Sequence, residues 1–241
     1  MNSRIALSFI ALLAASSLHA QDSLPPFARP NGNLLRPATL TYSVELRRPD
    51  GQVTQLGTRS VVVSDFSMGG VPSWLIVEAR NGTVVPTLDS VVVTRADMTP
   101  EHWASSIGTA QLAASFTRDS AFGVLQNYQG RSSFVVGVPG NVLLSASHGE
   151  RVIEMLPLAD GYRAAATMLV VGGAQPVLMP AELVVEREED VLVGTQHVRA
   201  WRVALRSGAI EARYWVSRDT TRVVRTEQAL GEGLMIGTLL P

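Results

Sequence analysis

The sequence contains no cysteine and no lysine, so all twenty of its basic residues are arginine. Without cysteine the chain has no disulfide bond, no thiolate metal site and no cysteine to carry a lipid. We interpret the lack of lysine as a bias of genomic composition. Gly69-Gly70 and Gly172-Gly173 lack both the lysine and the spacing of a phosphate-binding loop, which leaves them as turns. A net charge of −1 argues against an electrostatic nucleic-acid partner.

Long apolar runs are also lacking beyond the first twenty residues. Residues 1–20 have the pattern of a signal peptide: Arg4, then the apolar run Ile5–Ala15, then Leu18-His19-Ala20 as a cleavage site. The run is shorter than the roughly 20 residues that span a bilayer, which favours cleavage over anchoring. We therefore expect an exported, soluble protein, periplasmic or extracellular, that is not acylated and has no transmembrane segment in its mature part.

The rest of the chain alternates apolar and polar residues at the period of a β-strand. Residues 21–37 are rich in proline and are predicted to be a disordered lead-in. From residue 38 to 241, alternating runs separated by short turn signals predict one β-rich domain with about 10–12 antiparallel strands. Val177–Arg187 and Val191–Val193 are predicted as separate strands, with Glu188-Glu189-Asp190 as the turn between them.

One segment, residues 142–156, departs from this rhythm. Val142, Val152, Ile153 and Leu156 are among apolar residues at helical spacing, and Pro157 ends the segment. Ser147 and Glu150 have the spacing of a capping box. This pattern predicts a short helix within 142–156. Because so short a helix is stabilised by packing, we expect it to lie on the sheet.

The C-terminal strands resemble those of uncharacterised bacterial envelope proteins that are themselves similar to the Lol-type superfamily of outer-membrane lipoprotein carriers. Leu156-Pro157-Leu158 and Gly161-Tyr162 extend the resemblance more loosely, back to about Leu40. It implies a mainly β fold: a single strongly curved antiparallel sheet or open half-barrel, with one short helix on the concave side. The residues that carry it are Trp201, Tyr214, Trp215, Val216, Asp219, Val223, Val224, Arg225 and Glu227.

Motifs for catalysis are incomplete. Leu88-Asp89-Ser90 is similar to an aspartic-protease signature, but Val91 replaces the required glycine and there is no second copy. His102, His148 and His197 lack the spacing of a metal site. Ser147 next to His148 does not define a catalytic pair, because geometry rather than adjacency does so. We therefore predict no catalytic residues, no metal site and no cofactor.

Several strands are apolar on both faces, such as Val61-Val62-Val63 and Val91-Val92-Val93. This pattern fits either a ligand cavity or a closed barrel or sandwich with a filled core, because periodicity does not separate the two. The residues that we predict as cavity lining are Leu144, Ile153, Met155, Met168 and Trp201.

Three functions are compatible with these observations. The first is a non-enzymatic envelope protein that binds an apolar ligand, an acyl chain or a lipoprotein anchor, in the concavity of the sheet. The second is a structural or protein-interaction module with a filled core and no ligand. The third is a hydrolase whose site, with His148, assembles from distant residues.

Overall fold

The computed structural model describes residues 24–82, 85–128, 130–140, 142–144, 147–172 and 175–241. Within them the secondary structure is almost entirely β, with one α-helix, α1 (Ser147–Glu154), and a 3-10 turn at Gly32–Leu34. The strands are β1 (Ala38–Arg47), β2 (Val53–Met68), β3 (Val71–Gly82), β4 (Thr87–Thr94), β5 (Pro100–Ile107), β6 (Ala110–Phe116), β7 (Ser120–Asn127), β8 (Gly130–Gly137), β9 (Val142–Leu144), β10 (Arg163–Gly172), β11 (Gln175–Val193), β12 (Gln196–Ser207), β13 (Ile210–Ser217), β14 (Val223–Leu230) and β15 (Gly233–Leu239).

All these strands belong to one sheet, in the order β8-β7-β6-β5-β4-β3-β2-β1-β15-β14-β13-β12-β11-β10-β9. Two meanders, β1 to β8 and β10 to β15, are joined where β1 pairs with β15. Every pairing is antiparallel except that of β9 with β10. The sheet has two edges, β8 and β9, so it does not close on itself.

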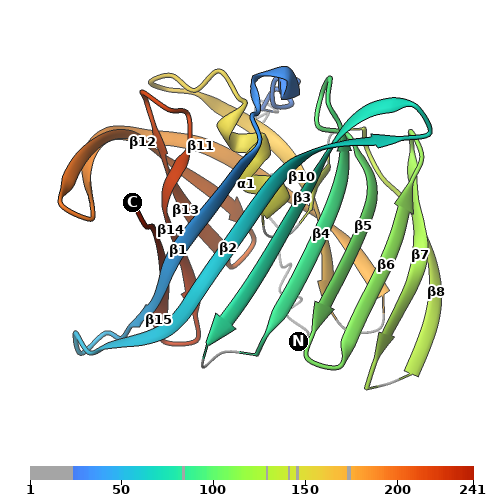
Figure 1. Ribbon diagram of the computed structural model, residues 1–241, viewed down its shortest axis with the longest axis horizontal. Helices are drawn as coiled ribbons and strands as arrows, with labels where there is room; N and C mark the ends of the chain where they lie inside the picture. The colour runs from blue at the N-terminus through green and yellow to red at the C-terminus, as the bar shows by residue number, and fades with distance from the viewer. Residues whose placement is uncertain (1–23, 83–84, 129, 141, 145–146, 173–174) are drawn as a thin grey trace, which may run out of the picture.

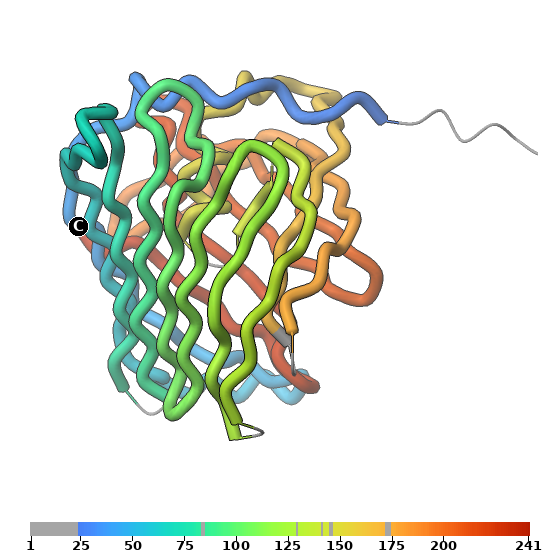
Figure 2. Tube along the Cα trace, turned by 90° about the vertical axis from the view of Figure 1, so that its right-hand side faces the viewer, coloured from blue at the N-terminus to red at the C-terminus, as the bar shows by residue number. Residues whose placement is uncertain are grey.

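The sheet curves until its two meanders face each other (Figure 1). β2 to β8 form one wall, β10 to β14 form the other, and α1 lies between them on the concave side. Seen from the side, the N-terminal segment crosses one end of this half-barrel (Figure 2). The structure thus confirms the predicted mainly β class and its single helix, with fifteen strands among the described residues in place of 10–12.

Alternation places the core on the concave face. In β3, Trp74 and Ile76 are buried, and in β4, Val91 and Val93 are buried. They join one large apolar cluster that also contains Ile153 of α1. A helix of eight residues is too short to be stable in isolation. It is therefore stabilised by packing its apolar side chains into this cluster, between the two walls.

The described part of the Pro-rich segment, residues 24–37, packs on the sheet and is not the disordered lead-in that the sequence predicts. Phe27 and Leu35 are buried in the core cluster. The indole Nε1 of Trp74 donates a hydrogen bond of 2.9 Å to the carbonyl oxygen of Gly32. Apart from the 3-10 turn at Gly32–Leu34, residues 24–37 form no helix or strand, and two apolar side chains attach them to the sheet.

The helix α1 lies within the segment 142–156, as predicted, and occupies Ser147–Glu154 of it. Residues Val142–Leu144 form β9, which pairs in parallel with β10 and is entirely buried. The capping box is also absent: the buried Ser147 Oγ has no hydrogen bond, and Glu150 turns to Arg59 instead. A buried strand of three residues is too short to show alternation between apolar and polar residues. Its apolar residues therefore looked like a continuation of the helical pattern.

The predicted turn at Glu188-Glu189-Asp190 is wrong, because β11 runs through it to Val193. The turn follows instead at Gly194, whose φ is +59°. Arginines of neighbouring strands pair with the glutamates of this run, for example Arg202 Nη1 with Glu189 Oε1 at 3.6 Å. A run of charges therefore fits within a strand when its ion pairs lie across the sheet.

Candidate functional site

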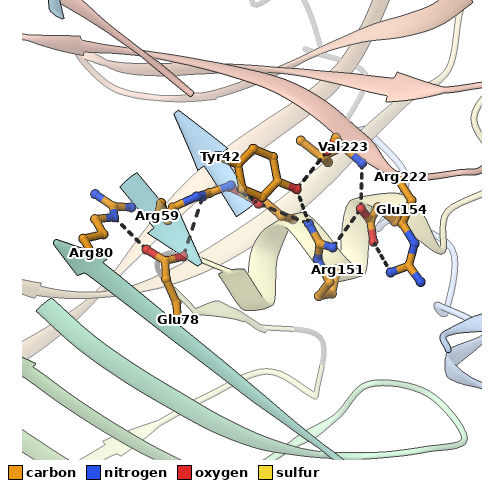
Figure 3. A network of polar contacts seen from close by, with 9 residues as sticks. Tyr42, Arg59, Glu78, Arg80, Arg151, Glu154, Arg222 and Val223 are labelled. Atoms are coloured by element: carbon orange, nitrogen blue, oxygen red, sulfur yellow. Dashed lines mark hydrogen bonds and ion pairs between the residues drawn. The ribbon is translucent and has the colours of Figure 1, made fainter. Parts of the chain in front are cut away.

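A row of arginine and glutamate side chains, buried except at its two ends, crosses the concave side of the sheet, and we call it the Arg–Glu ladder (Figure 3). Signs alternate along it, so each internal charge lies between two opposite ones. Its members, in order, are Arg80, Glu78, Arg59, Glu150, Arg151, Glu154 and Arg222.

Arg59 of β2 is the centre of the ladder. Its guanidinium binds both carboxylate oxygens of Glu150, with Nη2 to Oε2 at 2.9 Å, and lies 3.6 Å from Glu78 Oε2. It also lies 4.2 Å from the ring centroid of Tyr42, its cross-strand partner on β1. Burial would raise the pKa of Glu150, but the charge of Arg59 holds it below the usual value. This carboxylate therefore remains ionised inside the protein.

The helical half of the ladder is tied to β14. Arg151 Nη1 lies 3.0 Å from Glu154 Oε1, and the same oxygen accepts a hydrogen bond of 2.6 Å from the amide of Val223. Tyr42 Oη donates to the carbonyl oxygen of Val223 at 2.9 Å. Burial raises the pKa of Glu154 to about 7 despite Arg151. These contacts fix α1 against both meanders.

His148 is a structural residue of α1. Its Nδ1 accepts a hydrogen bond from the amide of Leu144 at 3.2 Å, and Nε2 donates to the carbonyl oxygen of Met98 at 3.1 Å. Burial lowers the pKa of this imidazole to about 4, so the ring is neutral at physiological pH. Because both ring nitrogens bind the backbone, His148 is not placed to serve as a general base.

A different serine and histidine do meet, on the outside of the sheet. Ser115 Oγ lies 3.0 Å from Nδ1 of the exposed His102. Among the described residues no carboxylate forms a hydrogen bond or salt bridge with His102, so a triad is not assembled there. The described residues also contain no cluster of three histidines or carboxylates that suits a metal ion.

A central cavity of about 270 Å³ adjoins the ladder on the concave side. Arg59, Glu78, Arg80 and Glu150 form its charged wall, and Asp89 of β4 adds a further carboxylate. The opposite meander contributes apolar and aromatic residues, among them Met168, Leu205, Ile210, Tyr214 and Met235, and the polar residues Thr226, Glu227 and Gln228.

Two further hollows adjoin this cavity. A groove of about 420 Å³, which we call the apolar groove, shares Ser105 and Ile107 with it and continues over Leu112 and Leu125 to Val171 of β10. A second groove, of about 550 Å³, shares Arg80 and Met235 with the cavity and is lined by Leu56 and Leu230 among others.

Strand register explains why the concave surface is charged near the ladder and apolar in the apolar groove. Residues directly opposite each other on neighbouring strands share a face. The pairs run Glu78 to Asp89, Asp89 to Ser105, Ser105 to Leu112 and Leu112 to Leu125. One continuous row across β3 to β7 therefore passes from the ladder into the apolar groove.

The five residues predicted as cavity lining lie in different places. Leu144, Ile153 and Met155 are together in the buried core around α1. Met168 lines the central cavity. Trp201 packs on the core cluster, and the guanidinium of Arg218 lies 4.9 Å from its ring. Whether any of them contacts a ligand stays a prediction.

The charged side chains of the cavity were not predicted as site residues, although the sequence carries a signal for them. Arg59 shares its strand face with Val61 and Val63, Glu78 follows Trp74 and Ile76, and Asp89 precedes Val91 and Val93. A charge that continues an alternating buried face indicates a polar group held inside the fold. The valine runs on the same strands indicated an apolar lining, and only apolar or aromatic residues were predicted.

The fold and the site together define a class: an open, strongly curved β-sheet around an internal cavity with mixed charges. No protein-family model and no curated protein matches the sequence. Solved structures that are similar to it include the following two. A β-barrel-like protein of the domain of unknown function DUF1849 from Brucella abortus has a TM-score of 0.48 and 10% identity, over 85% of this chain and 95% of that one. The hypothetical lipoprotein YmcC from Escherichia coli has a TM-score of 0.34 and 14% identity, over 85% and 87%.

At these TM-scores neither likeness carries an argument about this chain. The predicted relation to Lol-type carriers is not confirmed by them and stays a prediction. The signal-peptide pattern lies outside the described residues. In the part of the chain that the structure describes, no helix has the length and apolar character to cross a bilayer.

Proposed function

We propose that this chain is an exported, non-enzymatic envelope protein that binds an amphiphile, with an apolar chain in the apolar groove and a polar head in the central cavity. The observation that carries the proposal is the continuous row from Glu78 to Leu125, in which charged and apolar surface adjoin on one concave face. The signal-peptide pattern of residues 1–20 supports export.

This proposal refines the apolar ligand expected from the sequence. A pure hydrocarbon in the central cavity would cover charged groups without replacing their hydration, which is unfavourable. An acyl chain with a polar head leaves the charged wall to polar atoms and places its methylene groups along Leu112 and Leu125. Each methylene removed from water contributes about 0.8 kcal/mol.

A binding role is favoured over hydrolysis because of how His148 is held. The hydrolase hypothesis needs this imidazole to accept a proton, yet its two nitrogens are engaged by Leu144 and Met98. Its low pKa follows from burial in the core and not from an arrangement with a nucleophile.

Ile107→Arg is expected to weaken binding of an uncharged fluorescent long-chain alcohol by roughly tenfold, because it puts a charge where an apolar chain should lie. Ile107 suits this test because its side chain lines both the cavity and the groove while the residue is 55% exposed, so a larger side chain has room. Titration of the delipidated protein followed by fluorescence measures the affinity.

Val135→Arg is the matched control, because Val135 of β8 is 80% exposed and lines neither the cavity nor the grooves. The control should bind the probe as the unmodified protein does. Partitioning that does not saturate, or equal loss in both variants, would show that the groove is not the binding site.

A further inference from the structure

Two carboxylates of the central cavity stand outside the Arg–Glu ladder: Glu227, which pairs with Arg225, and Asp89. Asp89 is 5% exposed, and its Oδ1 accepts a hydrogen bond of 2.6 Å from Nε1 of Trp103. Its Oδ2 is buried and accepts no hydrogen bond of ordinary geometry, although the Ser105 hydroxyl opposite it lies close enough to lower its pKa. Among the described residues Asp89 forms no salt bridge, whereas Glu78 and Glu150 each bind arginine.

The neighbours of Asp89 make this position short of positive charge. Glu78 lies directly opposite it on β3, and like charges in that position repel. Arg80 is engaged by Glu78, with Nε to Oε1 at 2.7 Å, and Arg59 is engaged by Glu150. Burial, assisted by the charge of Glu78, raises the pKa of Asp89 to about 6, although hydrogen bonding to Trp103 and Ser105 and the charge of Arg80 act in the opposite direction.

Asp89 also lies where the cavity meets the apolar groove. Ser105, its partner across the sheet, lines both spaces, and Trp103, its hydrogen-bond donor, lines the groove. A group that binds Asp89 Oδ2 can therefore carry a chain directly into the groove.

We propose that Asp89 binds the primary ammonium head of a cationic amphiphile whose chain follows Ser105, Leu112 and Leu125. The inference rests on the proposed function, and names the class of ligand for that site. An ammonium group supplies both the charge and the hydrogen-bond donors that Oδ2 lacks. An anionic head would instead face Glu78 and Asp89, and the nearby guanidinium groups of Arg59 and Arg80 are already paired.

The test compares dodecylamine, dodecanol and dodecanoate, which share one chain length, by isothermal titration calorimetry at about pH 7.5. There the amine carries its proton and Asp89 is largely ionised. The unmodified protein should bind the amine at least about tenfold more tightly than the alcohol, because hydrogen bonds between charged groups are stronger than neutral ones. Dodecanoate should be the weakest of the three.

Asp89→Asn should remove the preference for the amine, and saturable binding of the alcohol in the apolar groove shows that the variant folds. Asp219→Asn, in the exposed turn before β14, is the matched control and should keep the preference. Equal affinity for amine and carboxylate, or an undiminished preference in Asp89→Asn, overturns the inference. Failure of all three compounds to bind saturably overturns the proposed function itself.

A pH series on the unmodified protein tests the inference should Asp89→Asn fail to fold. The ratio of amine to alcohol affinity should fall as the pH is lowered from about 7.5 to 5, because Asp89 gains a proton. The other charged or titratable groups that face the cavity are Arg59, Glu78, Arg80, Glu150, Tyr214 and Glu227. The pKa of Glu150 lies below its usual value and that of Tyr214 above its usual value, so neither titrates in this range. A ratio that does not change with pH overturns the inference.

Discussion

Replacing Arg59 with methionine is expected to lower the free energy of unfolding by about 3–5 kcal/mol, the range for breaking a buried ion pair. The guanidinium neutralises both Glu150 and Glu78, which are buried with it. Methionine fills most of the volume but leaves two carboxylates without their shared partner. Since whole domains are stable by only about 5–15 kcal/mol, this single change should bring the protein close to unfolding.

Arg163→Met provides the matched control. Arg163 of β10 forms a salt bridge with Glu182 at 2.5 Å, but its side chain is 57% exposed. Loss of such a pair costs about 0–1 kcal/mol. Urea denaturation followed by tryptophan fluorescence should separate the two variants clearly. Similar midpoints would mean that the ladder contributes no more than a surface ion pair.

The second large effect is a pH dependence that His148 imposes. The pKa of this imidazole is about 4 in the folded protein and 6.5 in its ordinary state. Between these values the unfolded chain binds a proton that the folded protein does not. Stability should therefore fall by about 3 kcal/mol as the pH drops from 6.5 to 4 through this group alone.

His148→Gln isolates this contribution from those of other groups. Burial raises the pKa of Glu154 to about 7 and that of Asp89 to about 6, so acid favours the folded state through these two carboxyl groups. Their effects are common to both proteins and cancel in the comparison. Urea denaturation at several pH values should show the stability gap narrowing by about 3 kcal/mol between pH 6.5 and 4. If the difference in free energy of unfolding between the two proteins does not change with pH, His148 is not neutral and buried as described.

Periodicity predicted the sheet because each strand has to present one face to the core. Tyr42 and Val44 of β1 alternate with more exposed residues, and the turn at Gly69-Gly70 lies where the sequence signals it. The prediction of a turn at Glu188 was wrong. Local composition favours a turn there, but ion pairs with neighbouring segments of the sheet keep the chain extended. Those partners are known only once the register is known.

The site was harder to predict than the fold for a related reason. Arg59, Glu78 and Asp89 lie on three strands, and only the register of β2, β3 and β4 brings them to one cavity. The sequence shows each as a single charge beside valines or isoleucine. Likewise, Glu150 has the spacing of a helix cap, and nothing local reveals that Arg59, far along the chain, binds it instead.

Native mass spectrometry of the protein purified gently from a cell-envelope fraction tests the central claim most directly. We expect a species heavier than the polypeptide by the mass of one amphiphile, which solvent extraction removes. Adding back an amphiphile should restore a one-to-one complex. The bare polypeptide mass before extraction, together with no complex on addition, would contradict the account and favour a filled structural module.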